Sequence, residues 1–167
     1  SGLRVLLWSP AALPATPGWL DLLEAELAGT GTPGLISPTL IYEDGSIFHG
    51  GAADSAGPML GYARAWMTRG APRAMPAGAA QLALIDREAM ASSGGFSGRL
   101  YSDAMVHRDL GRRLHQHGFG TWSSRSVDFW MLEDPPGAGD AIMHLLERVD
   151  SSLIGNMAAN DCGDRLG

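Results

Sequence analysis

The sequence predicts an α/β domain built on a mixed β-sheet flanked by helices, and three observations lead to this fold class. Short apolar runs alternate with amphipathic helical stretches, as in proteins whose strands are joined by helices. A hairpin and a long Gly-rich stretch interrupt the alternation, which argues against a regular doubly wound sheet. With 167 residues, 45% of them hydrophobic, the chain is long enough for one domain with a substantial core.

Composition excludes several classes of partner. The formal net charge of -6 argues against nucleic acid or an anionic membrane as the main partner. The single cysteine, Cys162, excludes an internal disulfide and a zinc site made of several cysteines. No stretch approaches the roughly 20 apolar residues of a membrane-spanning helix, and no signal peptide opens the chain. We therefore expect a cytoplasmic protein. Because the chain starts directly on an apolar strand, we also expect it to be part of a larger protein.

The chain opens with a predicted strand and helix. Residues 3–8 are apolar and predict a buried strand. Thr16 and Pro17 then predict a helix N-cap followed by proline at the first helical position. The helix is expected to end at Gly29. Its apolar face carries Leu20, Leu23 and Leu27.

A hairpin and a long loop follow. Residues 35–42 predict a second strand, and Asp44-Gly45 predicts a turn that returns the chain as the other hairpin arm. Residues 50–78 are rich in Gly, Ala and Pro and predict a long, partly ordered loop with a short helix at 62–67.

The second half alternates again. Residues 80–85 predict a third strand, and 87–93 predict a short helix that closes at Gly94-Gly95. Ser102 is the next candidate N-cap, for a helix that ends at Gly118. The expected buried stripe of that helix is Val106, Leu110 and Leu114.

The chain is expected to finish with a strand, a break and a helix. Residues 121–131 are strand-like, 134–137 form a break, and 141–149 carry an amphipathic helical pattern. We therefore expect one domain over residues 1–150, followed by a weakly patterned tail over residues 151–167.

Four segments, taken in order, resemble family 2 glycosyltransferases of the GT-A fold. Leu6-Leu7-Trp8 followed by Pro17-Gly18-Trp19-Leu20 is similar to the strand and helix that flank the family's metal-binding Asp. Residues 36–51 resemble its hairpin, residues 84–96 resemble its strand, short helix and Gly-Gly-Phe turn, and residues 109–118 resemble its last core helix. The resemblance covers residues 3–130 and implies a partial GT-A-like sheet whose nucleotide-binding half lies upstream.

The resemblance also implies a chemistry. Inverting sugar transfer from a nucleotide-sugar to a saccharide acceptor needs Mg²⁺ or Mn²⁺ on the leaving diphosphate, usually held by an Asp-x-Asp. It also needs a carboxylate base that takes the proton from the acceptor hydroxyl. In the family this base is the first Asp of a Glu-Asp-x-Asp motif at the start of the last core helix.

This chain differs from the family at both positions. The metal-binding Asp is expected near Ala11, but Ser9-Pro10-Ala11-Ala12 contains no carboxylate, so no metal ligand is assigned. The base is expected eleven residues before Gly118, at His107. Val106 takes the Glu position, and Asp109 fits the second Asp.

Two residues could replace the missing base. His107 could act itself, since an ordinary histidine pKa near 6.5 suits a general base. Asp103, four residues earlier on the same helix face, could reach the same space. The plainer alternatives are that Asp103 completes the helix start and that His107 lies on the surface. The predicted catalytic residues are therefore Asp103, His107 and Asp109.

The predicted substrate-binding residues are Gly94, Gly95, Trp66 and Arg113. Asp109 and Arg113 are four apart, so a helix-stabilising ion pair explains them as well as a site does. Trp66, like Trp122 and Trp130, could stack on a sugar ring, although tryptophans more often pack in cores.

His115 and His117 are two residues apart on a helix and point to different faces, which argues against a zinc site.

Three hypotheses remain at the level of sequence. The chain is the acceptor-side portion of a glycosyltransferase, completed by the rest of its parent protein. Alternatively, it is a degenerate transferase fold that binds or assembles without catalysis. A third reading is an unrelated α/β domain whose motifs match by chance.

Overall fold

The computed structural model describes residues 4–50, 52–53, 57–58, 69–79, 81–97 and 103–132. They all belong to a compact unit that spans Ser1–Glu133, and a second unit spans Asp134–Gly167. The break, helix and tail predicted after residue 133 lie outside the described residues, as do the predicted short helix at 62–67 and the N-cap at Ser102.

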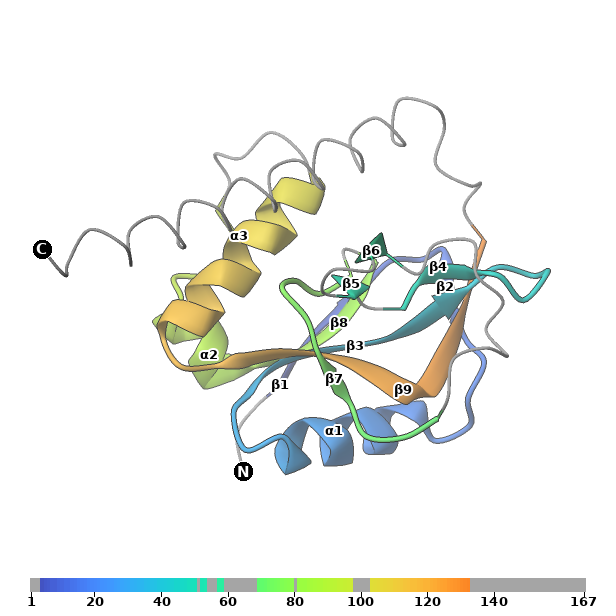
Figure 1. Cartoon of the computed structure of the whole chain (residues 1–167), viewed down its shortest axis with the longest axis horizontal. Helices are drawn as coiled ribbons and strands as arrows, with labels where there is room; N and C mark the ends of the chain where they lie inside the picture. Colours follow the sequence, from blue (N-terminus) through green and yellow to red (C-terminus); the bar gives the residue numbers. More distant parts are fainter. Residues whose placement is uncertain are drawn as a thin grey trace, which may run out of the picture. The chain divides into compact units, whose positions relative to one another are not determined.

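Among the described residues, seven strands form one mixed sheet, which confirms the predicted α/β fold class (Figure 1). They are β1 (Arg4–Trp8), β2 (Ala12–Pro14), β3 (Pro33–Ile41), β4 (Ile47–His49), β7 (Arg73–Ala74), β8 (Leu82–Asp86) and β9 (Gly120–Met131). The order across the sheet is β1-β8-β3-β9-β2, with β4 also paired to β3 and β7 also paired to β9. β3 and β9 run parallel, and the other pairs are antiparallel.

Helix α1 (Trp19–Gly29) covers one face of the sheet (Figure 1). Leu23 and Leu27 are fully buried, as predicted, whereas Leu20 is 38% exposed. The ring of Trp19 meets those of Trp8 and Phe129 edge-on, with centroids 5.2 and 5.0 Å apart. The buried residues on this face are Ala12, Leu23, Leu27, Ile36, Leu40, Ala79, Leu82, Leu84, Val127, Phe129 and Met131.

The start of α1 corrects the prediction of an N-cap at Thr16. The helix begins at Trp19, and Gly18 occupies the cap position with a left-handed φ of 65° and no side-chain cap bond. The hydroxyl of Thr16 instead accepts a hydrogen bond from the backbone N–H of Asp128 at 2.9 Å. Thr16 therefore stabilises β9 rather than the helix.

Helices α2 (Arg87–Ser92) and α3 (Asp103–Gln116) cover the opposite face (Figure 1). The core on this side consists of Leu35, Ala83, Ile85, Ala89, Leu110 and Leu114. α3 lies close to the chain at residues 76–77 because position 111 is glycine. A Cβ on Gly111 would collide with the carbonyl oxygen of Pro76. The predicted stripe is confirmed at Leu110 and Leu114, whereas Val106 is only half-buried.

The first strand forms as predicted, but the prediction that it is buried is wrong. β1 lies at one end of the sheet order. Among the described strands it pairs only with β8. Val5, Leu6 and Trp8 are 37, 38 and 44% exposed. Because successive side chains alternate between faces, β1 exposes apolar groups on both faces of the sheet.

The described residues of the stretch at 50–78, predicted as a long, partly ordered loop, include three short strands. Two short strands, β5 (Ala52–Ala53) and β6 (Gly57–Pro58), pair with each other. β7 then adds to β9, with Arg73 opposite Ser123 and Ala74 opposite Trp122. The predicted turn at Asp44-Gly45 is confirmed, since Gly45 has a φ of 79° and Tyr42 bonds Ser46 across it.

No helix in the described ranges combines the length and the apolar character that crossing a membrane requires.

Candidate functional site

The turn at Gly94-Gly95 is set by the end of α2. Asp86 caps the start of this helix by accepting bonds from the N–H groups of Glu88 and Ala89 at 2.9 and 3.0 Å. At the other end, Gly94 and Gly95 adopt φ angles of 78° and 70°, a left-handed conformation that side chains disfavour. The N–H of Gly95 then bonds the carbonyl of Met90 at 3.0 Å, which closes the helix.

Arg113 joins α3 to this turn. Its Nη1 donates to the carbonyl of Ser93, and its Nε donates to Asp109 Oδ2 at 2.8 Å. A Cβ placed on Gly94 would lie 3.7 Å from Nη1, so the guanidinium lies beside the glycine turn. Its Nη2 is buried and has no hydrogen-bond partner within the described part of the chain. Arg113 thus links two other predicted site positions, Asp109 and the turn at Gly94.

Asp109 is engaged by two arginines. Arg112 Nη2 donates to its Oδ1 at 3.2 Å, in addition to the bond from Arg113. Burial by itself raises the pKa of Asp109, but the hydrogen bonds and charges of Arg112 and Arg113 outweigh it and hold the pKa below its ordinary value. A carboxylate with a lowered pKa is a weak proton acceptor. The geometry therefore favours the ion-pair interpretation of Asp109 over that of a base.

His107 is buried, which corrects the alternative that it lies on the surface. Only 8% of the residue is exposed, and its ring is 5.1 Å from that of Phe96 at a tilt of 58°. It lies on the same helix face as Leu110 and Leu114, three and seven residues further along. The Gly-Gly-Phe turn and the start of the resembling helix are therefore in direct contact.

The structure describes the other predicted site residues, Asp103 and Trp66, only in part or not at all. Asp103 is the first residue of α3, one helical turn before His107, and its side chain lies outside the described part of the structure. Trp66 lies outside the described residues altogether. The structure thus brings together Gly94, Asp109 and Arg113. His107 lies beside the same turn, because its ring contacts that of Phe96.

The turn at Ser9-Pro10-Ala11 does not fit a divalent cation. The hydroxyl of Ser9 accepts from the N–H of Ala11 at 3.3 Å, and the carbonyl of Ser9 accepts from Ala12 at 3.0 Å. No carboxylate stands in this turn, and no group of three potential His, Cys, Asp or Glu ligands occurs among the described residues. We therefore derive no step through a bound metal.

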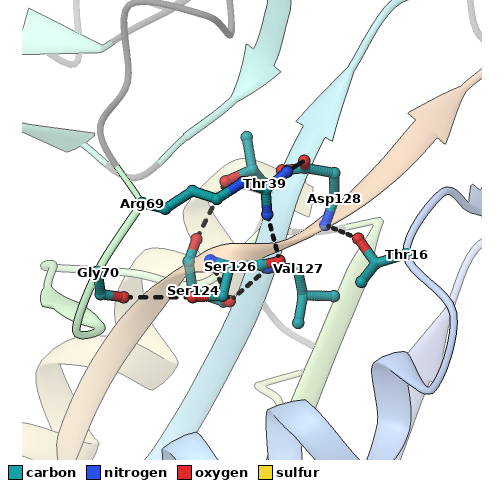
Figure 2. A network of polar contacts seen from close by, with 8 residues as sticks. All are labelled: Thr16, Thr39, Arg69, Gly70, Ser124, Ser126, Val127 and Asp128. Atoms are coloured by element: carbon teal, nitrogen blue, oxygen red, sulfur yellow. Dashed lines mark hydrogen bonds and ion pairs between the residues drawn. The ribbon is translucent and has the colours of Figure 1, made fainter.

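A polar network on β9 was missed by the sequence reasoning. β9 pairs with β3 at Ser123 and again at Asp128, opposite Ser37 and Thr39, so the strand bulges between the two points. In this bulge, Ser124 Oγ accepts from the N–H groups of Ser126 and Val127 at 3.2 and 3.0 Å. Figure 2 shows the bulge and its surroundings. The signal in the sequence is the run Ser-Ser-Arg-Ser, which breaks the apolar alternation of the strand.

Arg69 docks onto this bulge (Figure 2). Its Nη1 donates to the carbonyl of Ser126 at 2.9 Å, and its Nη2 approaches Asp128 Oδ2 at 3.2 Å. The carboxylate-bearing side chain of Asp128 is 10% exposed, and that of Arg69 is 64% exposed. The pair therefore presents a solvent-accessible guanidinium above a mostly buried carboxylate.

The two described tryptophans considered for sugar stacking differ in exposure. Trp122 is half-buried against the α1-side core, and its Nε1 donates to the carbonyl of Thr32 at 3.4 Å. Trp130 is 37% exposed and lines a surface hollow with Leu13, Glu43 and Leu132. Trp130 is thus the better placed of the two for contact with a ligand.

Comparison with protein-family models and with curated proteins gives no relative. No protein-family model matches this chain, and no curated protein matches it.

Proposed function

We propose that this chain is the acceptor-side portion of a glycosyltransferase-like domain. The parent protein would transfer a sugar from a nucleotide-sugar to a saccharide acceptor in the cytoplasm. The observation that carries the proposal is the contact between Arg113 and the Gly94 turn, because it joins two segments whose resemblance to family 2 glycosyltransferases was noted separately. The four resembling segments also lie, in chain order, on elements of one mixed sheet and its helices.

In this proposal, Asp103 or His107 takes the proton from the acceptor hydroxyl as its oxygen attacks the anomeric carbon and the nucleoside diphosphate leaves. Asp109 has a different role. Because it is bound by Arg112 and Arg113, it orients Arg113 against the carbonyl of Ser93 and so holds the glycine turn in place.

A second candidate function is a binding or assembly module without catalysis. Two observations favour it: the turn at residues 9–12 contains no carboxylate, and Asp109 is held in ion pairs. In this case the GT-A-like sheet would be retained for binding.

The decisive experiment compares variants of the full-length parent protein in a sugar-transfer assay. Asp103→Asn combined with His107→Gln removes both candidate bases, and His117→Gln is the matched control because His117 is exposed on the same polypeptide segment. Loss of transfer in the double variant, with an unchanged control and an unchanged Tm, supports catalysis. Full transfer in the double variant would contradict the catalytic roles of both residues and favour the binding module.

Isothermal titration with UDP- and GDP-sugars and Mn²⁺ provides an independent measurement. Binding to the full-length parent is expected if the upstream half supplies the nucleotide site. Absence of binding to every donor would count against the transferase proposal.

A further inference from the structure

One row of side chains crosses four strands on the face of the sheet opposite α1. The registers place Ile47 beside Ile41, Ile41 beside Trp130, and Trp130 beside Leu13. Burial falls steadily along this row, from fully buried Ile47 to Leu13, which is 45% exposed. The row therefore changes from core to surface at Trp130.

A hollow of about 330 Å³ lies over the exposed end of this row. Among the described residues it is lined by Leu13, Glu43, Trp130 and Leu132. Its volume is at the lower end of the roughly 300–1,000 Å³ of small-molecule sites, so it suits a ligand of one or two rings. The lining combines a broad aromatic surface with a single carboxylate, and Glu43 is exposed.

We propose that this hollow binds a saccharide. A pyranose ring has an apolar C–H face, which can stack on the indole of Trp130, and hydroxyl groups at its edge, which can donate to the Glu43 carboxylate. An aromatic side chain is suited to this task because it contributes a large contact area at a low cost in conformational entropy. A purely apolar ligand would offer no hydrogen-bond donor to the Glu43 carboxylate that lines the hollow, whereas a sugar hydroxyl does.

A second polar group lies along the same strand. Asp128 precedes Trp130 by two residues, so both side chains lie on one face of β9, roughly 7 Å apart along the strand. Arg69, bound to Asp128, lies beside the same strand (Figure 2), and its side chain is 64% exposed. A disaccharide that stacks one ring on Trp130 can therefore direct hydroxyl groups of the next ring toward the Arg69 guanidinium.

The hollow adjoins the turn at which the family's metal ligand is expected. The N–H of Leu132 bonds the carbonyl of Ala11 at 2.9 Å, and Trp8 Nε1 donates to Ala12 in the same turn. An acceptor sugar bound at Trp130 would thus lie next to the turn at which the resemblance to family 2 glycosyltransferases places the metal ligand. This assignment as an acceptor site rests on the proposed function, whereas saccharide binding itself does not.

The test is a titration of the full chain, followed by ¹H–¹⁵N NMR of the tryptophan indoles. The probes are rhamnose, N-acetylglucosamine, maltose and N,N′-diacetylchitobiose. The Trp130 indole resonance, identified from its loss in Trp130→Leu, is expected to shift on addition of at least one probe. Trp130→Leu should lower affinity at least tenfold, and Glu43→Gln should lower it by about tenfold, because the amide is a weaker acceptor than the carboxylate for a sugar hydroxyl.

Matched controls are Leu22→Ala and Glu24→Gln, both exposed on α1, which should bind as the unchanged chain does. The proposal is overturned if no probe shifts the Trp130 resonance, or if Trp130→Leu binds normally. It is also overturned if the hollow is filled by the chain itself, in which case the Trp130 indole would be protected from a soluble paramagnetic quencher in the free protein.

The two proposals fail separately. Saccharide binding at Trp130 without any transfer by the parent protein would leave this site standing and exclude catalysis. Sugar transfer by the parent protein, together with a Trp130 indole resonance that no saccharide shifts, would support catalysis and exclude this binding site.

Discussion

The Nε of Arg113 donates to the carboxylate of Asp109 at 2.8 Å, one helical turn earlier on α3. The same guanidinium bonds the carbonyl of Ser93 at the end of α2. One ion pair therefore stabilises a helix and also fixes the glycine turn against it. This relationship is what makes the segment around Gly94 a defined corner of the fold.

Asp109→Asn should destabilise the protein by about 1 kcal/mol at neutral pH, the range of partly exposed helix ion pairs. The folded-state pKa of Asp109 is lowered, so its stabilising contribution is present above the unfolded pKa near 4 and is lost as the pH falls through the lower folded pKa. Urea unfolding at a series of pH values measures this. The difference from the unchanged chain should shrink as the pH falls below about 4. A difference that is independent of pH would contradict the ion-pair account.

Gly111→Ala should destabilise the protein although alanine favours helices. The propensity gain is about 1 kcal/mol, but the new Cβ collides with the backbone of Pro76, and overpacking of this kind costs about 1–3 kcal/mol. Gly29→Ala in α1 is the matched control, because a Cβ there meets nothing within 4 Å. Thermal unfolding should show a lower Tm for the first variant and an equal or higher Tm for the second. Equal behaviour of the two would show that α3 is not held close to residues 76–77.

Ser124→Ala should cost about 1–3 kcal/mol, because it leaves the buried N–H of Val127 and the partly buried N–H of Ser126 without their shared acceptor. Ser126→Ala is the control, since its hydroxyl donates an exposed bond to the carbonyl of Gly70 at 3.3 Å. Chemical denaturation distinguishes the two. A Ser124 variant as stable as the control would mean that the bulge does not depend on this hydroxyl.

Leu6→Lys should reduce self-association while leaving stability nearly unchanged. β1 is an apolar strand at one end of the sheet formed by the described strands, and a lysine is a common means of blocking pairing between such edges. Light scattering over a range of protein concentrations measures the change in mass. Leu22→Lys, on the exposed surface of α1, should have no comparable effect. Equal mass distributions for both variants at every concentration would argue against pairing through β1.

Local sequence signals located most elements correctly. Glycine residues marked the ends: Gly45 turns the hairpin, Gly94 and Gly95 close α2, and Gly118, with a φ of 82°, follows the end of α3. These positions are predictable because the responsible bonds join residues close in the chain. The Thr16 cap failed for the opposite reason, since its hydroxyl bonds Asp128, 112 residues away.

The candidate site was predicted in part. The sequence identified Gly94, Asp109 and Arg113, and the spacing of Asp109 and Arg113 already allowed the ion pair that forms. It did not reveal the burial of His107, because helix periodicity gives a face but not what covers it. The network of Arg69 and Asp128 was missed altogether, since it joins residues 59 positions apart across a strand bulge.

The sequence by itself determined the α/β alternation, the hairpin turn, the glycine corner after α2 and the buried stripe of α3, because each follows from backbone preferences and periodicity over a few residues. The tertiary structure alone decided that β1 lies at an exposed edge, that β9 bulges at Ser124, and that Trp130 emerges at the surface beside Leu13 and Glu43. These features depend on which strands become neighbours. Strand pairing is a long-range choice, set by the packing of the whole sheet rather than by any one of its segments.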